Sequence, residues 1–258
     1  MSCLHLPPEI FDYIVDFLRG ERKTLKNCCL VSRSWVPRAR KHLFDELHFE
    51  LLSNLNAWNA TFPDPVNSPA HYTRFLTIAC VRVIPAVDVK ESSWVRGFSN
   101  AVRLRMWDST WDLLLFPPTA SHRFSNLPVG YKTWSASGLF HLVFALPLLK
   151  DLSVVGYGIQ DADAIFQSST SPPLTGTLAL HLIRGMGPVT RRLLEPPNSV
   201  HFRKLECTLN VQDDLLCIAD IAEACSDTLE CIDITIPSKL HPVGFFHGSL
   251  TNLHLFSR

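Results

Sequence analysis

Apolar residues near the start of the chain recur at the spacing of one face of a helix. The positions are Ile10, Ile14, Phe17 and Leu18, and intervals of three and four residues predict a helix with one apolar side. Two prolines precede this stripe and suit a first helical turn, because an N–H there would have no helical partner. Gly20 stands where a left-handed residue commonly ends a helix.

Two further short helices are expected before residue 50. Thr24 is placed to cap the second, whose apolar positions are Leu25, Cys28 and Cys29. Ser34 is placed to cap the third. Three short helices make a small core, and a core of this size rarely supplies more than ~3–5 kcal/mol. We therefore expect this unit to depend on a partner or on the rest of the chain.

Beyond residue 73 the apolar pattern changes to repeated copies of L-x-x-L-x-L, with other apolar residues in some leucine positions. The copies begin at Leu149, Thr175, Phe202, Leu229 and Leu250, at intervals of 26, 27, 27 and 21 residues. These intervals lie within the range of leucine-rich repeats, about 20–29 residues. Further strands are expected at 75–78, at 102–106 and near 131–134.

Helix-like segments alternate with these strands, at 94–98, 139–146, 189–194 and 213–225. The last is the clearest, with a broad apolar face made of Leu215, Leu216, Ala219, Ile221, Ala222 and Cys225. A strand-and-helix unit of this length cannot bury its own apolar face, so neighbouring units must stack. The sequence predicts an α/β fold: a three-helix unit followed by an irregular solenoid, with parallel strands on one face and helices on the other.

The predicted organisation has three parts: the helical unit over 4–49, a linker over 50–73 and the repeat region over 74–258. The linker contains three prolines, Pro63, Pro65 and Pro69, in a segment that cannot continue a helix. The chain stops directly after the last predicted strand, without the polar capping unit that normally ends a solenoid. We therefore expect the repeat region to be truncated at its C-terminus.

The N-terminal string resembles an F-box, and it is most similar to the F-box-like domains of mushroom-forming fungi. The opening Leu6-Pro7-Pro8-Glu9-Ile10, the helical spacing that follows and the element Leu30-Val31-Ser32-Arg33-Ser34-Trp35 occur together and in order. The later repeats resemble the degenerate leucine-rich regions of the same fungal proteins. Because a helical apolar stripe is also typical of any three-helix core, the alternative of an ordinary buried face stays open.

The resemblance implies a surface that binds the Skp-type adaptor of an SCF ubiquitin ligase and, through the adaptor, a cullin. The residues it assigns to this surface are Leu6, Pro7, Ile10, Ile14, Leu18, Leu25, Leu30, Val31 and Trp35. The implied function is a non-catalytic substrate-recognition subunit that bridges the adaptor to a target protein. The alternative is an interaction scaffold whose F-box no longer engages a ligase.

A second candidate surface lies on the predicted strand at 102–106. Arg103 and Arg105 alternate there with Leu104 and Met106, so one face of the strand is basic. If that face is open, these arginines are candidate contacts for an acidic target protein.

Composition restricts the remaining classes of function. Lysine plus arginine equals aspartate plus glutamate at 24 each, so nothing indicates nucleic-acid binding. The longest apolar run, 139–149, is much shorter than the ~20 residues of a membrane-spanning helix, and the N-terminus lacks the features of a signal peptide. We expect a cytoplasmic or nuclear protein whose eight cysteines are reduced thiols.

No motif indicates an enzyme, a cofactor or a metal. Cys217, Cys225 and Cys231 lack the paired spacing of structural zinc sites. The nucleophile motif G-x-S-x-G is missing, and Gly156-Tyr157-Gly158 lacks the third glycine of a phosphate-binding loop. We therefore expect no catalytic residues, no cofactor and no metal ligand.

Overall fold

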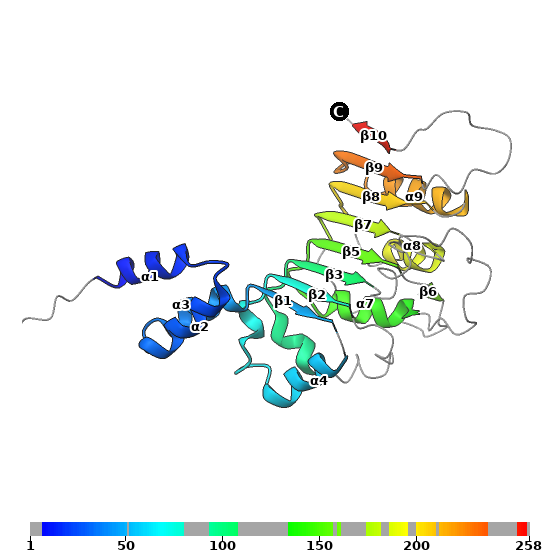
Figure 1. The fold of residues 1–258 in the computed structure, drawn as a ribbon. Helices are drawn as coiled ribbons and strands as arrows, with labels where there is room; N and C mark the ends of the chain where they lie inside the picture. Colours follow the sequence, from blue (N-terminus) through cyan, green and yellow to red (C-terminus); the bar gives the residue numbers. More distant parts are fainter. Residues whose placement is uncertain are drawn as a thin grey trace, which may run out of the picture.

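The protein is an α/β structure in which three N-terminal helices precede a long sheet (Figure 1). The computed structural model describes residues 7–50, 52–79, 93–107, 134–156, 159–160, 174–181, 186–195, 200–209, 212–236 and 252–256. Within these residues no helix has the length and apolar character needed to cross a membrane.

The predicted three-helix unit is present. Its helices are α1 (Pro8–Phe17), α2 (Arg22–Val31) and α3 (Val36–Leu43). Gly20 has a φ of 102°, as expected for the left-handed residue after α1. The two predicted caps are wrong, because α2 begins after Glu21 and α3 after Trp35, and neither side chain makes a capping hydrogen bond. The Ser34 hydroxyl instead contacts the hydroxyl of Ser32 at 2.8 Å.

The three helices share a small apolar core of their own. Its buried members are Val15, Leu25, Cys28, Ala39 and Leu43. Phe44, directly after α3, packs against this core and also against the larger core of the sheet region. Its ring lies 6.0 Å from that of Trp58. The N-terminal unit is therefore joined to the rest of the molecule by apolar packing as well as by the chain.

The main sheet has eight described strands, and they lie side by side in the order in which they occur along the chain. They are β1 (Glu46–Phe49), β2 (Phe75–Ile78), β3 (Arg103–Trp107), β5 (Asp151–Val155), β7 (Thr177–His181), β8 (Lys204–Thr208), β9 (Cys231–Thr235) and β10 (Asn252–Phe256). The first seven are parallel. Two short parallel strands, β4 (Trp134–Ser135) and β6 (Ile159–Gln160), form a separate sheet.

The strand register follows the repeat in the sequence. Leu152, Leu178, Leu205 and Ile232 are successive partners across β5, β7, β8 and β9. These residues occupy the same place in successive L-x-x-L-x-L copies, so the strands predicted from those copies are confirmed. Leu152, Leu178 and Leu205 are fully buried, because alternate residues of a strand point to the same face of the sheet.

Two parts of the sheet differ from the predicted organisation. β10 runs antiparallel to β9, whereas the last repeat copy predicts another parallel strand. β1 lies within the range assigned to the helical unit, yet it pairs with β2 as the first strand of the sheet. The range predicted as a linker contains α4 (Leu52–Thr61) and the 3-10 helix η1 (Pro69–Tyr72). Leu55 and Ala70 of these two helices are buried in the main core.

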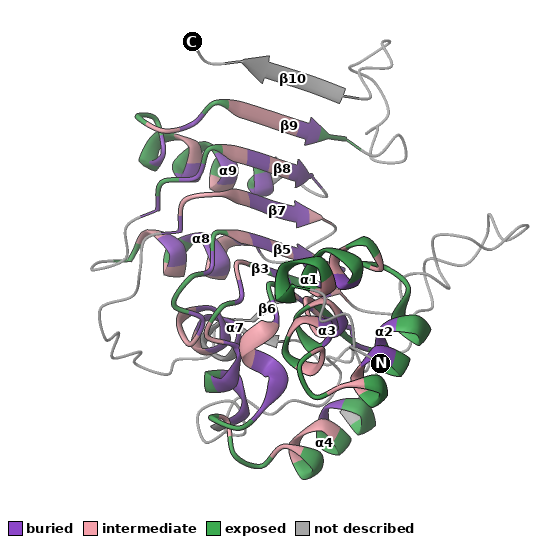
Figure 2. Ribbon diagram, turned by 90° about the vertical axis from the view of Figure 1, so that its left-hand side faces the viewer, coloured by how far each residue is buried: buried purple, intermediate pink, exposed green. Residues whose placement is uncertain are grey.

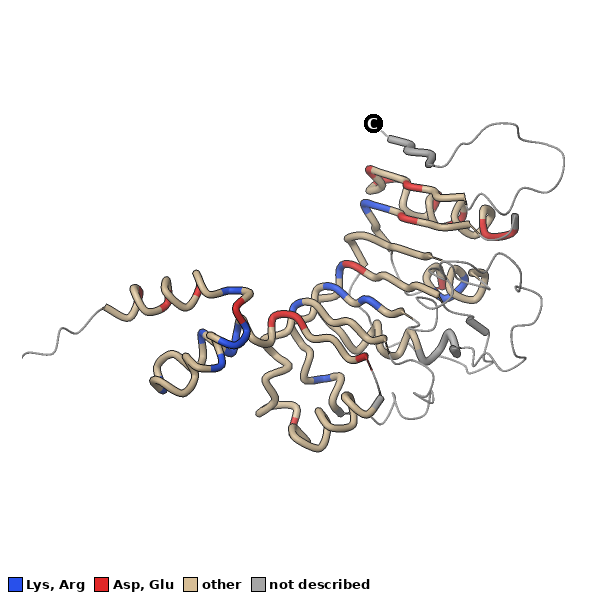
Figure 3. The backbone as a smooth tube through the Cα atoms, in the orientation of Figure 1, with Lys and Arg blue, Asp and Glu red and all other residues tan. Residues whose placement is uncertain are grey.

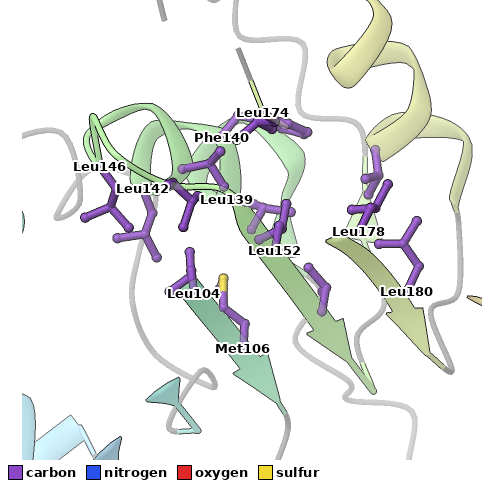
Figure 4. Packing of buried hydrophobic residues seen from close by; sticks show 14 of the residues in the cluster. Leu104, Met106, Leu139, Phe140, Leu142, Leu146, Leu152, Leu174, Leu178 and Leu180 are labelled. Carbon is purple, nitrogen blue, oxygen red and sulfur yellow. The ribbon is translucent and has the colours of Figure 1, made fainter. Parts of the chain in front are cut away.

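Four helices at the predicted positions pack on one face of the sheet: η3 (Ser93–Phe98), α7 (Ala136–Phe144), α8 (Met186–Leu194) and α9 (Gln212–Ala224). Figure 4 shows Leu139 and Leu142 of α7 pointing toward Leu104 of β3 in this core. The expected apolar face of α9 is partly wrong, because Leu215 and Leu216 are 48% and 67% exposed. Its buried side is made of Asp214, Ile218 and Ile221, and Cys225, directly after the helix, is buried as well.

Candidate functional site

Helix α1 carries apolar side chains on two of its sides. Phe11, Val15 and Leu18 turn toward the small core of the N-terminal unit. A second set, which we call the α1 stripe, is exposed; its members are Ile10 (45%), Tyr13 (73%), Ile14 (40%) and Phe17 (83%). Their spacing of three, one and three residues places them on one side of the helix. Figure 2 shows α1 as a mainly exposed helix, and in Figure 1 it lies at the left, away from the sheet.

Exposing such an apolar stripe to water is unfavourable in free energy, and binding of a partner protein would bury the stripe. A surface helix usually presents charged and polar residues on its outer side. Burying one large apolar side chain is worth about 1.5–3 kcal/mol when the side chain starts fully exposed. Contiguous exposed apolar residues are therefore typical of a site that binds another protein.

The end of α2 adds a second exposed apolar group. Leu30 is 86% exposed and Val31 is 69% exposed; we call these two residues the α2 tip. The chain then turns, and Trp35 packs its indole against Phe11 of α1 with ring centroids 5.5 Å apart. This contact holds the segment after the α2 tip against α1.

The predicted adaptor surface is therefore only partly a surface in the folded chain. Five of the predicted residues are exposed. Pro7 precedes the α1 stripe, and Ile10 and Ile14 belong to it. Leu30 and Val31 form the α2 tip. Leu6 lies outside the described residues. Leu25 is completely buried in the helical core, and this corrects its assignment to the surface. Leu18 and Trp35 are half-buried against the same core.

Tyr13 and Phe17 are the exposed residues that the predicted surface lacks. Both are more exposed than Ile10 and Ile14. The signal for them was present in the sequence, because Tyr13 lies three residues after Ile10 and Phe17 lies three after Ile14.

A charged cluster fixes α1 against α3. Arg38 of α3 donates from Nε to Oδ1 of Asp16 in α1 at 2.5 Å, and its Nη2 donates to Oδ2 of the same carboxylate. Nε2 of His42 lies 2.7 Å from Asp16 Oδ1. The hydrogen bonds from Arg38 and His42 hold the pKa of the Asp16 carboxyl well below its usual value. The ionised Asp16 thus sets how α1, and with it the α1 stripe, is oriented.

The second candidate surface is the face of the sheet opposite the helices, which we call the open face. Arg103 and Arg105 of β3 both lie there and are exposed, as the alternation in the sequence predicts. Arg103 is engaged in an ion pair with Asp151 of β5 at 3.2 Å. Oδ1 of the same aspartate accepts from the backbone N–H of Thr177 at 2.8 Å. Arg103 is therefore a structural residue as well as an exposed one.

Aromatic rings support the arginines of the open face. The guanidinium of Arg103 lies over the Phe75 ring at 5.1 Å, and that of Arg105 lies over the Trp107 ring at 6.0 Å. The Trp107 ring is in turn 6.0 Å from the ring of His48. Such cation–π contacts restrict the arginines without using their hydrogen-bond donors.

Acidic residues occupy the other end of the open face. Glu206 of β8 and Asp233 of β9 are register partners. Figure 3 shows basic residues on β3, which are its two arginines, and acidic residues on β8 and β9. Lys204 lies 2.6 Å from Glu206, and Nε2 of His181 lies 3.9 Å from it. Burial lowers the pKa of His181, against the opposing influence of Glu206.

No metal centre is found in the described part of the chain, where no group of three or more histidine, cysteine or acidic side chains is arranged to hold an ion. Cys225 is buried, and its thiol lies 3.7 Å from the carbonyl oxygen of Val200. Burial raises the pKa of the Cys207 thiol to about 12. These two cysteines act as apolar core residues.

Comparisons with models of protein families, with curated proteins and with solved structures found no match to this chain. The candidate sites consequently depend on the sequence pattern and on the geometry described above.

Proposed function

We propose that this protein is a non-catalytic substrate-recognition subunit of an SCF-type ubiquitin ligase. In this proposal α1–α3 form an F-box-like domain that binds a Skp-type adaptor and, through it, a cullin. The sheet and its helices form an irregular leucine-rich-repeat solenoid that binds a target protein. Catalysis belongs to other subunits, and this chain raises the effective concentration of the target beside them.

The observation that carries the proposal is the exposed α1 stripe. It directly follows the Pro7-Pro8-Glu9-Ile10 segment on which the resemblance to an F-box depends. Docking of an apolar helix face in a groove is a common mode of peptide and protein recognition, in which a few anchors supply most of the affinity. Tyr13 and Phe17 are the largest exposed anchors that α1 offers.

The repeat region supports the second half of the proposal. Its strands follow one another in sequence order, with partners at a nearly constant interval from β5 to β9. Stacked units of this type create extended binding surfaces. The open face and the α1 stripe belong to different elements, so one chain offers separate surfaces for an adaptor and a target.

The test is co-precipitation of a purified Skp-type adaptor by the purified full-length chain. We expect the wild-type chain to bind and the double variant Tyr13→Ser with Phe17→Ser to lose at least about tenfold in affinity, which is the effect of ~1.4 kcal/mol. The matched control is Leu216→Ser on α9, which replaces another exposed apolar residue and should leave binding unchanged. Failure of the wild-type chain to bind, or equal binding by the double variant, would contradict the proposal.

Recovery of a cullin separates the ligase subunit from a scaffold. If the chain binds the adaptor in a reconstituted mixture and the complex also retains a cullin, it is a ligase subunit. Adaptor binding without retention of the cullin identifies the scaffold alternative.

A further inference from the structure

Positive charge is concentrated in α2, in α3 and in the turns at their ends. Eight of the chain's 24 lysines and arginines lie between residues 19 and 41, and the only acidic residue in this range is Glu21. Figure 3 shows these basic residues gathered where α2 and α3 lie. The formal net charge of the whole chain is zero, so this part of it carries a local excess of positive charge.

Most of this charge has no partner within the part of the chain that the structure describes. Arg19 is paired with Asp45 at 2.9 Å, and Arg38 is paired with Asp16. The other six basic residues, which we call the basic cluster, are exposed and form no ion pair with a described residue. They are Arg22, Lys23, Lys26, Arg33, Arg40 and Lys41. Like charges three or four residues apart in a helix repel each other, and an anionic partner would relieve this repulsion.

The basic cluster adjoins the α2 tip. Lys23, Lys26 and Leu30 follow one another at intervals of three and four residues, so they lie on one side of α2. Leu25 and Cys28 are buried in the helical core and mark the opposite side. The solvent side of α2 therefore presents an exposed leucine together with two unpaired lysines.

Helix α3 adds a cation next to α2. Burial raises the pKa of the Cys29 thiol, and the charge of Arg40 opposes this rise. Arg40 of α3 therefore lies close to α2. In the other direction, Nη2 of Arg22 donates to the carbonyl oxygen of Leu43, at the end of α3, at 3.3 Å. Cations of the two helices consequently lie beside each other.

The charge of α1 restricts the kind of partner. Glu9 and Asp12 are exposed and directly neighbour Ile10 and Tyr13 of the α1 stripe in the chain. A uniformly anionic surface, such as a lipid bilayer or a nucleic acid, would be attracted to α2 and repelled by α1. A protein surface presents acidic residues to one helix and apolar or basic residues to the other. The mixed charge of the helical unit therefore favours a protein.

We propose that the basic cluster binds an acidic segment of a partner protein, in which acidic residues stand on both sides of an apolar residue that contacts Leu30. This rests on the proposed function only in taking that partner to be the adaptor. Attraction between the acidic segment and the basic cluster also raises the rate at which the two proteins associate.

The test is selection of random displayed decapeptides on the immobilised full-length chain, at low salt and without adaptor. We expect the enriched peptides to contain two or more Asp or Glu residues with a large apolar residue between them. Their binding should weaken about tenfold or more between about 0.05 M and about 0.5 M salt, because salt screens exposed charges. No enrichment, or enrichment of peptides without acidic residues, would overturn the proposal.

Two pairs of substitutions locate the bound peptide. Lys23→Gln with Lys26→Gln should weaken binding of a selected peptide about fivefold or more, as expected for the loss of two exposed ion pairs. Glutamine preserves α2 because its helix propensity is close to that of lysine. The matched control is Arg96→Gln with Lys150→Gln, which removes two exposed charges of the repeat region and should leave binding unchanged. Equal effects of the two pairs would show that only net charge matters and would overturn the assignment.

Competitors distinguish a protein from other anions. An oligothymidylate and vesicles of phosphatidylcholine with phosphatidylserine are each added at the same total negative charge as a selected peptide. We expect neither competitor to displace the peptide, because both lack apolar groups between their charges and are repelled by α1. Displacement by either would overturn the choice of a protein partner.

Binding of the purified adaptor separates this inference from the proposed function. If the adaptor binds and Lys23→Gln with Lys26→Gln leaves its association rate unchanged, this inference fails for the adaptor and the proposed function stands. If the selected peptides bind and the adaptor does not, the proposed function fails and the basic cluster keeps its acidic ligand.

Discussion

Asp16 and Arg38 form a two-pronged ion pair that ties α1 to α3, with the Nε–Oδ1 contact at 2.5 Å. The pair is partly exposed, so its contribution to stability is reduced by solvent. The pair matters more for the orientation of α1 than for stability. Among the described residues, α1 makes few other polar contacts with α2 and α3.

The first prediction concerns loss of this ion pair. Asp16→Asn should destabilise the attachment of α1 by about 1 kcal/mol, which raises local opening about fivefold. Hydrogen exchange of the α1 amides at pH 7 measures this, with Asp12→Asn on the same helix as the control. The pKa of Asp16 in the folded protein lies below its unfolded value of ~3.9. The ion pair therefore stabilises the attachment of α1 above about pH 4, and this stabilisation is lost as the pH falls. Equal exchange by wild type and Asp16→Asn at pH 7 would contradict the role of the pair.

The second prediction separates the two apolar sides of α1. Val15 is 1% exposed and Phe17 is 83% exposed. Val15→Ala should lower the free energy of unfolding of the helical unit by about 2 kcal/mol, because it leaves a cavity. Phe17→Ser should change that free energy by no more than about 0.5 kcal/mol. Urea denaturation of both variants measures the difference, and a large loss of stability in Phe17→Ser would show that the α1 stripe is buried in solution.

The third prediction compares two glycines. A Cβ at Gly176 would clash with Oδ1 of Asp151 and lie 2.8 Å from the carbonyl oxygen of Lys150, whereas one at Gly187 in α8 would meet nothing within 4 Å. Gly176→Ala should destabilise the protein by about 2 kcal/mol or more, because backbone must move. Gly187→Ala should stabilise it by about 0.5 kcal/mol, since alanine is the better helix former. Thermal denaturation of both variants checks the opposite signs.

The fourth prediction concerns buried hydroxyl groups. Thr73 is fully buried, and its Oγ1 has no hydrogen-bond partner among the residues that the structure describes. Thr73→Val should raise the free energy of unfolding by about 1 kcal/mol, because it removes an unsatisfied polar atom without changing the shape of the side chain. The matched change Thr228→Val should have the opposite effect, since that hydroxyl donates to the carbonyl oxygens of Phe202 and Cys225 at 3.2 and 3.3 Å. Chemical denaturation that ranks the two variants in the reverse order would contradict this.

The fifth prediction concerns thiol reactivity. Thiolates react with iodoacetamide and neutral thiols do not. Because burial raises the pKa of Cys207 to about 12, this residue should remain unlabelled in the native protein at pH 8. Cys217 and Cys231 are less buried and should be labelled before Cys207. Peptide mass spectrometry before and after unfolding in urea measures the order, and rapid native labelling of Cys207 would refute it.

The sequence predicted the strands of the sheet well, and the reason is periodicity. Each L-x-x-L-x-L copy places buried residues on alternate positions of a strand, as in Leu152 and Val154 of β5. β1 was missed although Phe44, Leu47 and Phe49 fit the same pattern, because they follow directly on a helix. The antiparallel direction of β10 was not predictable, since alternation looks the same in both directions of a strand.

The candidate surface was harder to predict than the fold. Helical spacing shows that Ile10, Ile14 and Phe17 share a side of α1, but it does not show whether that side faces the core or solvent. The core side is instead made by Phe11, Val15 and Leu18. Leu25 was assigned to the surface for the same reason. Only the packing of three helices together separates a buried leucine from an exposed one.

Because the strands lie side by side in sequence order, such a protein can gain or lose one whole strand-and-helix unit at a time. A unit inserted between two neighbours contributes one more strand and leaves every other pairing intact. The sheet would widen by about 4.8 Å with each inserted strand. Duplication or loss of a single unit would therefore change the width of the open face in fixed increments.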